Sequence, residues 1–572
     1  MRRSVLTTTA ALLAAASPAA AQPVEIAPGV TLDRVERPGP QVVHVMRVRQ
    51  GPLTRVAPIL TSGSPARRER LSVAISALAP TGAVGGINGD FFNVDNAYPS
   101  GLALTGGELV SEPEVTRSAT LFGPDGRIQV PRLELTGRFQ AVDPAGLVTY
   151  SVRTFNGINR PAERSSEVIL YTPRYGAATP TPSTNSRFEA AIQLDAGQSP
   201  TVNAPLSGTV VAAASGGGMP IGPGQVVVTG VGSSGPGVAQ DLVPGRRATL
   251  GINVPAIPAG VLDGIGGGPL LVSAGVPVTD AGEGFTAAQL TTRTPRSAVG
   301  QTAGGDILLV TTEGPATGSR GVTAAEQAQL MAELGAVDAM GLDAGGSATL
   351  VASSGLVFPS GSERAITTAL AVFHRGVSIA PLPLEKVSPN GDRVEDTVPV
   401  EVRTPVPGTV TVSLERRGGG LRRDVLSGPT GQGAFPLRIN PRALGVPDGP
   451  YAVVARLAPA DGSAASEHRR RLIVDGTLGG LRLRAAKRGR ARELGIRFTL
   501  ARKANVTVRV LGPDGRPLRT LRAGKALRAG PQLVTWDRTI RRKPAVGAFT
   551  VDVQARSSLG TTGLQAQTTL TY

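Results

Sequence analysis

Glycine and proline recur so often along this chain that long helices have little room to form. The 572 residues include 74 Gly and 47 Pro, and both residue types interrupt regular structure and favour turns. Between them lie short runs of β-forming residues. These runs are 41–48, 119–122, 167–171, 208–213, 225–228, 307–311 and 369–372. We therefore expect a fold built mainly from short strands.

Two segments instead have helical spacing. Residues 68–79 place Leu71, Ile75 and Leu78 on one face. The second segment opens with Thr323 and Glu326, whose side chains form a capping box with the first backbone donors of a helix. Residues 22–378 are therefore predicted to form one α+β domain, rich in β-strands with few helices.

The first 21 residues have the pattern of a secretory signal peptide. Arg2 and Arg3 precede a short apolar run, and Ala19 to Ala21 supply a cleavage site. The run is shorter than the ~20 residues that span a bilayer, so no transmembrane segment is predicted. We expect a secreted or cell-envelope protein. The chain has no Cys, so its modules must fold without disulfides or thiol chemistry.

The chain is strongly basic, with 59 Lys and Arg against 42 Asp and Glu and a net charge of +17. The basic excess concentrates towards the C-terminus. Outside a cell, such a surface favours anionic wall polymers or phospholipid headgroups. Nucleic acid is not an expected partner, because aromatic residues make up only 3% of the chain. Solvated basic faces without any partner are the alternative.

The sequence changes character near residue 380. A proline-rich linker at 381–383 is followed by two sets of alternating β-type runs, each set about as long as a ~100-residue antiparallel sandwich. We predict all-β sandwiches over 384–477 and 478–572.

The first candidate site motif is Asn88-Gly89-Asp90-Phe91-Phe92, placed where a short apolar strand would end. Polar side chains at strand ends often act on ligands. Asn88, Gly89 and Phe92 are candidate substrate contacts, and Asp90 is a candidate catalytic group. A plain Asn-Gly turn with core aromatics is the alternative.

Two further motifs suit an anion. Gly267 and Gly268 belong to a glycine run whose N–H groups could line one concavity. Arg293 and Arg296 flank a proline and could grip a phosphate with forked donors. A flexible loop and ordinary surface arginines are the corresponding alternatives.

The fourth motif follows the capped helix. A buried strand leads to Asp343, and three candidate substrate contacts come directly after it, namely Gly345, Gly346 and Ser347. A carboxylate beside backbone donors can act as a general acid or base; an Asp-led turn without chemistry is the alternative. Residues 22–378 contain only two histidines, so few residues could serve as the base of a Ser-His-Asp triad. Asp90 and Asp343 could instead form a carboxylate pair of the kind that cleaves glycosides.

In this order, the four motifs resemble the phosphodiester glycosidase family, the N-acetylglucosamine-1-phosphodiester α-N-acetylglucosaminidase-like enzymes. The matching blocks are 88–92, 266–271, 295–300 and 342–347, and the likeness extends over roughly residues 40–375. The sequence departs from the family pattern at Ala344, where a glycine is usual, and at Ser297, where a threonine is usual.

The resemblance implies hydrolysis of a sugar-1-phosphate diester at the sugar–oxygen bond, in extracellular or cell-wall glycans. Asp343 or Asp90 would handle the proton or water, Arg296 with Arg293 would hold the phosphate charge, and Asn88 would orient the sugar. No cofactor is expected, and a divalent metal stays open.

Residues 388–397 resemble the start of the immunoglobulin-like domain of flagellar hook-assembly proteins. The end of the second set, with Trp536-Asp537 and then Gly547-Ala548-Phe549, resembles the close of the same domain. Both likenesses imply immunoglobulin-like modules that act as spacers or contact the wall. Asp392, Glu395 and Asp396 lack the spacing of an EF-hand, so calcium is not expected there.

Two other functions stay open. In one, residues 22–378 are a non-catalytic, wall-associated binder of glycans or anionic polymers. In the other they form a metal-dependent phosphodiesterase, although histidine ligands are scarce.

Overall fold

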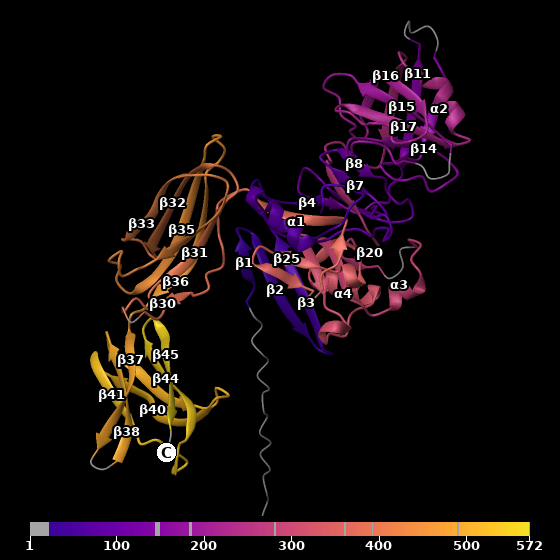
Figure 1. The fold of residues 1–572 in the computed structure, drawn as a ribbon. Helices are drawn as coiled ribbons and strands as arrows, with labels where there is room; N and C mark the ends of the chain where they lie inside the picture. Colours follow the sequence, from indigo (N-terminus) through magenta and orange to yellow (C-terminus); the bar gives the residue numbers. More distant parts are fainter. Residues whose placement is uncertain are drawn as a thin grey trace, which may run out of the picture.

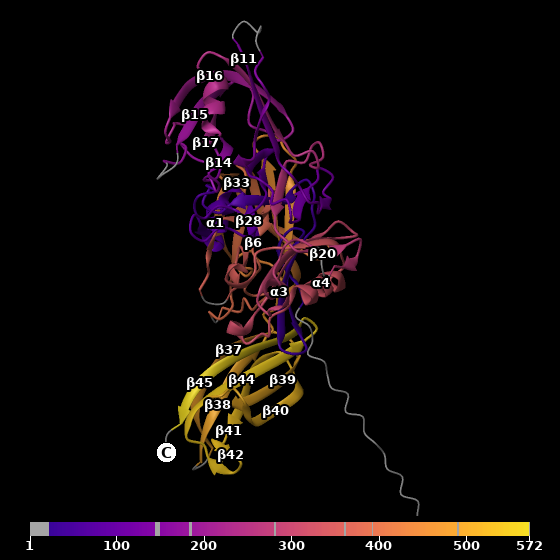
Figure 2. The same cartoon turned by 90° about the vertical axis from the view of Figure 1, so that its right-hand side faces the viewer.

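The computed structural model describes residues 22–143, 149–181, 186–278, 282–359, 362–391, 393–488 and 491–570. The predicted signal peptide and Asp392 lie outside the described residues. Figure 1 shows a central body, a second lobe above it, and two β-modules that follow one another away from the body. Figure 2 shows the same parts along one elongated molecule.

The central body contains two sheets that face each other. The first has eight strands, in this order: β1 (Val24–Ala27), β2 (Val30–Arg37), β3 (Gln41–Val48), β23 (Ile307–Thr312), β22 (Arg296–Thr302), β24 (Ala336–Gly341), β20 (Leu270–Ser273) and β21 (Val276–Pro277). The second has five: β26 (Gly355–Phe358), β25 (Leu350–Ala352), β6 (Ala83–Asn88), β28 (Thr368–His374) and β4 (Thr54–Leu60).

The apolar cores show how these layers stack. Met46 and Met340 of the first sheet share one buried cluster with Ile87 and Leu370 of the second. On its other face, the first sheet packs against α4 (Ala324–Glu333), and the second packs against α1 (Leu71–Leu78). The body is therefore a two-sheet sandwich with one helix on each outer face. A two-stranded ribbon of β27 (Ala365–Ile366) and β5 (Glu69–Arg70) leads into α1.

Both predicted helices are confirmed. Thr323 accepts the backbone N–H of Glu326, and the Glu326 side chain accepts the N–H of Thr323, as the capping box requires. Two shorter helices were not predicted: α2 (Gly235–Asp241) and α3 (Ala287–Thr291). Each spans too few turns for its apolar spacing to be read. Three 3-10 turns are also present: η1 (Ala79–Thr81), η2 (Pro315–Thr317) and η3 (Gly345–Ser347).

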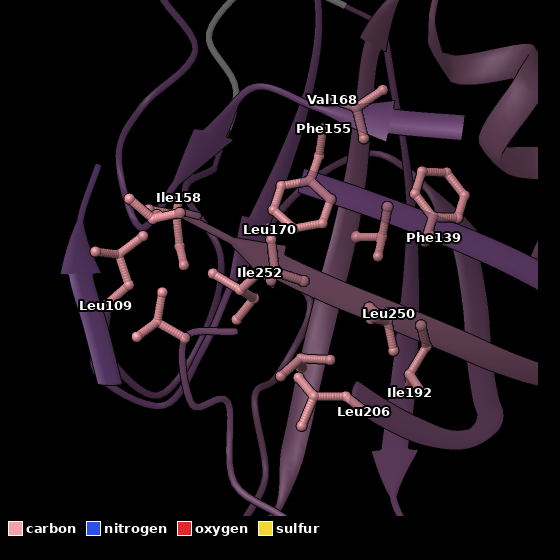
Figure 3. Close-up of a cluster of buried hydrophobic side chains, with 14 of the residues drawn as sticks. Leu109, Phe139, Phe155, Ile158, Val168, Leu170, Ile192, Leu206, Leu250 and Ile252 are labelled. Carbon is pink, nitrogen blue, oxygen red and sulfur yellow. The ribbon is translucent and has the colours of Figure 1, made fainter. Parts of the chain in front are cut away.

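A second lobe interrupts the central body. Its sheet has eight strands: β12 (Arg153–Phe155), β11 (Thr136–Val142), β18 (Arg247–Asn253), β16 (Pro205–Ser215), β15 (Arg187–Leu194), β17 (Gln225–Gly232), β14 (Ser166–Tyr171) and β13 (Gly157–Ile158). Figure 3 shows its core, where Phe139, Phe155 and Leu250 are labelled among buried side chains. Residues 22–378, predicted as one domain, thus contain a separate lobe that no local sequence pattern indicates.

A small sheet connects the lobe to the body. Its strands are β10 (Ile128–Gln129), β9 (Ala119–Phe122), β19 (Asp263–Gly266), β7 (Ala103–Thr105) and β8 (Glu108–Ser111). Leu104 and Leu121 pack into the core of the lobe, whereas Phe122 and Ile265 pack into the core of the body. The sheet is therefore buried from both sides.

The first C-terminal module has two sheets around one core. One sheet has three strands: β29 (Ser378–Ile379), β31 (Val398–Thr404) and β34 (Gly433–Ile439). The other has five: β30 (Lys386–Val387), β36 (Ser466–Val474), β35 (Gly449–Pro459), β32 (Gly408–Arg416) and β33 (Arg422–Thr430).

The last module repeats this plan around Trp536 and Phe498. Its three-stranded sheet comprises β37 (Leu478–Arg488), β38 (Ala491–Leu500) and β41 (Gly530–Trp536). Its four-stranded sheet comprises β40 (Pro517–Leu527), β39 (Ala504–Leu511), β44 (Gly547–Ser557) and β45 (Gly560–Leu570), and a hairpin joins β42 (Thr539–Ile540) to β43 (Lys543–Pro544). The β-rich fold is thus confirmed, and the likeness of both modules to immunoglobulin domains stays a prediction.

Candidate active site

Two distant loops meet where β6 and β24 end. Asp343 donates its backbone N–H to the carbonyl of Gly89 at 3.0 Å. The side chain of Asn88 holds the same junction, because Nδ2 donates to the carbonyl of Asp343 at 2.8 Å and Oδ1 accepts the N–H of Thr349 at 3.0 Å. Asn88 is fully buried. Its predicted contact with a sugar does not fit these bonds, and it positions the two loops instead.

Asp90 follows this junction and is almost fully buried, with 3% of its surface exposed. Oδ1 accepts the N–H of Phe91 at 2.7 Å, whereas Oδ2 has no hydrogen-bond partner among the described residues. Burial raises the pKa of Asp90 to about 7, against the opposing effects of Arg117 and the Phe91 N–H, and the neighbouring Asp343 carboxylate raises it further. This carboxyl group can therefore hold a proton near neutral pH.

Asp343 lies beside it in a more polar setting. Burial raises its pKa above the usual range, while the Ser347 hydroxyl and the Ala344 N–H stabilise the ionised form. Arg364 reaches this group through Ser347, since its Nη1 donates to Ser347 Oγ at 3.4 Å. The two carboxyl groups therefore have different surroundings, which is how paired acids take different roles.

Two glycines allow the backbone to pass close to the Asp90 carboxyl group. A Cβ at Gly101 would stand 2.6 Å from Asp90 Oδ2, and a Cβ at Gly266 would collide with the same oxygen. Both backbone segments thus pass directly against the carboxylate. The glycines predicted to contact the substrate, Gly267 and Gly268, come directly after Gly266 in the chain.

The N–H of Gly268 is not free to line the expected anion nest, and the part of Gly267 in such a nest stays a prediction. Gly268 donates its N–H to the carbonyl of Gly341 at 2.9 Å, and the preceding Gly266 donates to Leu102 at 2.7 Å. Because these two donors are used within the backbone network, they are not available to an anion. A Cβ at Gly267 would stand 2.5 Å from Gly341 O, which explains the need for glycine there.

Arg117 is a site residue that the sequence analysis missed. Its guanidinium lies 5.1 Å from the centre of the Phe91 ring and 5.7 Å from that of Phe285. Its positive charge opposes the rise that burial causes in the pKa of both Asp90 and Asp343. It is therefore the cation shared by both carboxylates, and no local sequence pattern singled it out.

Glu283 is a second missed group. It is 4% exposed, and its Oε1 accepts from Ser118 Oγ at 2.5 Å and from the Leu270 N–H at 3.1 Å. Its Oε2 has no partner within the part of the chain that the structure describes. A Cβ at Gly268 would stand 2.7 Å from this oxygen, so the carboxylate lies against the same glycine segment as Asp90.

The predicted phosphate grip by Arg296 and Arg293 does not fit their contacts. Arg296 is 5% exposed, and its guanidinium donates to the carbonyls of Val322, Gln289 and Thr292 at 2.9, 2.5 and 3.2 Å. Arg293 makes a two-pronged ion pair with Glu326 at the start of α4. Arg296 thus fixes the end of α3, the short helix that follows Phe285.

Of the other residues predicted to contact the substrate, Phe92 lies in the core, whereas Gly345 and Gly346 lie beside the candidate site. Phe92 packs in the cluster beside α1, as the core alternative expected. Gly345 has a φ of +65°, which favours glycine, and a Cβ at Gly346 would stand 2.9 Å from Arg364 Nη2. Ala344 has a φ of −112°, so the departure from the family pattern costs no backbone strain.

The described residues contain no cluster of three or more His, Cys, Asp or Glu that could hold a metal ion. Among the same residues, no helix is both long and apolar enough to cross a bilayer.

A family model agrees with the predicted resemblance. Residues 190–373 match the phosphodiester glycosidase model, and this range includes Asp343, Arg364 and Glu283. The likeness to phosphodiester glycosidases is therefore confirmed for this part of the chain. Asp90 and Arg117 lie before the matched range, and tertiary packing places them near Asp343.

Solved structures add a likeness in fold. A crystal structure of a hypothetical protein from Synechocystis is 26% identical, covers 61% of this chain and 62% of its own, and has a TM-score of 0.50. The chain thus spans less than two thirds of that protein's length. The catalytic domain of zebrafish N-acetylglucosamine-1-phosphodiester α-N-acetylglucosaminidase is 14% identical, with 60% of this chain and 82% of that chain covered and a TM-score of 0.30. No curated protein matches the chain.

Proposed function

We propose that the central body hydrolyses a sugar-1-phosphate diester at the bond between the anomeric carbon and the phosphate oxygen. The observation that carries this proposal is the buried pair of Asp90 and Asp343, both with a raised pKa. A pair of carboxyl groups in unlike surroundings is the usual equipment for glycoside cleavage. The family match to residues 190–373 supports phosphodiester-linked sugars as the substrate class.

In the proposed reaction, Asp90 is the general acid. Its pKa of about 7 leaves it partly protonated at neutral pH, so it can give a proton to the departing phosphate oxygen. Asp343 is better stabilised as an anion and acts on the sugar side, where it accepts a proton from the attacking water. The products are a free sugar and a phosphomonoester.

Arg117 and Arg364 are the proposed phosphate contacts, in place of Arg296. Arg117 is half-buried beside both carboxylates, and Arg364 reaches the site over Gly346. Guanidinium groups bind phosphate oxygens with paired donors. They also offset the negative charge that the carboxylates present to an anionic substrate. We infer export to the cell envelope, where wall glycans would be the substrate, from the signal-peptide pattern of residues 1–21.

The test is release of free sugar from a UDP-sugar by the purified chain. We expect turnover, a loss of activity in Asp343→Asn and Arg117→Met, and little change in Asp338→Asn, a partly exposed carboxylate on β24. Full activity in both Asp343→Asn and Arg117→Met would remove this mechanism. No turnover on any diester, together with salt-sensitive adsorption to cell walls, would favour the non-catalytic binder.

A further inference from the structure

The net positive charge of this protein comes almost entirely from its last module. Residues 478–572 contain 20 Lys and Arg against four Asp and Glu, so they carry +16 of the chain's net +17. The preceding residues are close to neutral. A field of one sign on one module is a typical cause of attraction to polyanions.

Acidic neighbours neutralise few of these cations. Within the described side chains of the module, ion pairs involve only three of its arginines, namely Arg502 with Asp448, Arg516 with Asp514 and Arg519 with Asp537. Asp552 is buried and bonds to Gln565. The remaining basic side chains thus have almost no carboxylates of their own module to face.

One pair of cations is placed in direct opposition. Arg482 of β37 lies across from Arg497 of β38 in the antiparallel register, and both are exposed. Arg484 is exposed on the same face, two residues along β37. Like charges directly opposite one another destabilise a sheet, and a bound anion would remove that cost.

A strained turn displays three more cations. The hairpin of β42 and β43 turns through Arg541 and Arg542, whose φ angles are +50° and +66°. Two positive φ angles define a type I′ turn, which favours Asn-Gly, and arginine in that conformation costs about 1–2 kcal/mol per residue. Both arginines and the following Lys543 are exposed.

The exposed cations lie on both sheets of the module. Arg482 and Arg497 belong to the three-stranded sheet, whereas Lys525 and Arg556 are exposed on β40 and β44 of the four-stranded sheet. The two sheets pack face to face, so their outer faces point in opposite directions. A flat bilayer or a stiff duplex reaches one of these faces, whereas a flexible chain can reach both.

Base stacking offers no support for single-stranded nucleic acid. The aromatic side chains in the described part of the module are Phe498, Trp536 and Phe549, and all three are buried in its core. A stacking platform needs exposed rings.

We propose that residues 478–572 bind a flexible, linear polyanion with closely spaced phosphate groups, which contacts both sheets and the Arg541–Lys543 turn. This interaction is independent of the reaction proposed for the central body. It would hold the enzyme on a phosphate-rich polymer whether or not that polymer is its substrate.

The test measures binding of the full chain to linear inorganic polyphosphate by calorimetry at 50 and 200 mM salt. We expect binding that weakens at least tenfold over this range, because each phosphate contact releases a counterion. The triple variant Arg482→Gln, Arg484→Gln and Arg497→Gln should bind at least tenfold more weakly at 50 mM salt. The matched variant Arg67→Gln, Arg164→Gln and Arg423→Gln removes three exposed charges elsewhere and should change affinity less than twofold.

A second variant separates loss of binding from misfolding. Arg541→Asn with Arg542→Gly places the favoured residues in the type I′ turn, so the module should unfold at a higher temperature while its affinity for polyphosphate falls. Equal weakening in the matched surface variant would overturn the proposal. Tighter binding to vesicles containing phosphatidylglycerol, or to duplex DNA, than to polyphosphate would also overturn it.

Discussion

The central body and the last module handle charge in opposite ways. The body buries a few ionisable groups among glycines, and burial is the main cause that raises the pKa of Asp90 to about 7. The last module leaves many arginines exposed and almost without acidic partners. Chemistry needs a small number of groups in a setting of low polarity, whereas attraction to a polymer grows with the number of exposed charges. Changes in one region should therefore leave the other function intact.

The largest difference between catalytic activity and polyphosphate binding is expected from Asp343→Asn. Removing one carboxylate of an acid–base pair lowers kcat by roughly 10²–10⁴-fold. Binding to polyphosphate should stay the same, because this residue lies in the central body. Steady-state release of sugar and calorimetry on the same preparation provide both measurements. Parallel loss of activity and binding would show that the two regions act as one.

The second prediction concerns how the free energy of unfolding of the central body depends on pH. The folded pKa of Asp90 is raised from 3.8 to about 7, so the folded state holds this proton more tightly than the unfolded state. The free energy of unfolding should therefore fall as pH rises from about 4 to 7, by roughly 4 kcal/mol at most. Asp90→Asn should remove this dependence, and denaturant titrations at several pH values compare the two proteins. An unchanged pH dependence in the variant would show that Asp90 is not the buried acid.

A smaller effect is expected from filling the space beside Asp90. In Gly266→Ala, the new Cβ would collide with Asp90 Oδ2, which should cost about 1–3 kcal/mol of stability and displace the carboxyl group. Gly304→Ala is the matched control, since its Cβ would meet nothing closer than 3.8 Å. Thermal unfolding and kcat are measured for both. Equal behaviour of the two variants would argue against close packing at this carboxylate.

The smallest effect lies in the last module. Arg482→Gln removes the opposition to Arg497 and should stabilise this sheet by about 0.2–1 kcal/mol at low salt. The gain should vanish near 0.5 M salt, where charges on the surface are screened. Hydrogen exchange of the β38 amides reports this locally. A gain that persists at high salt would indicate a cause other than repulsion.

Local sequence predicted much of what is local in the structure. The strand at residues 41–48 has the predicted bounds, and the capped helix begins after Thr323 as predicted, because alternation and capping depend on neighbouring residues alone. Local sequence did not reveal the lobe from β11 to β18, since the pair of β11 with β18 joins residues more than a hundred positions apart. The local sequence also suggested a phosphate contact for Arg296. Tertiary packing decides which carbonyls surround its guanidinium, and local sequence does not reveal them.

By itself, the sequence determined the β-rich character and the order of the four motifs, and it singled out Asp90 and Asp343 as candidate acids. Only the tertiary structure decided what surrounds these acids. Arg117 and Glu283 reach the site from loops without a motif, and Asn88 and Arg296 turn towards backbone carbonyls. The physical reason is that a residue type fixes its chemistry, whereas long-range packing fixes its burial, direction and partners.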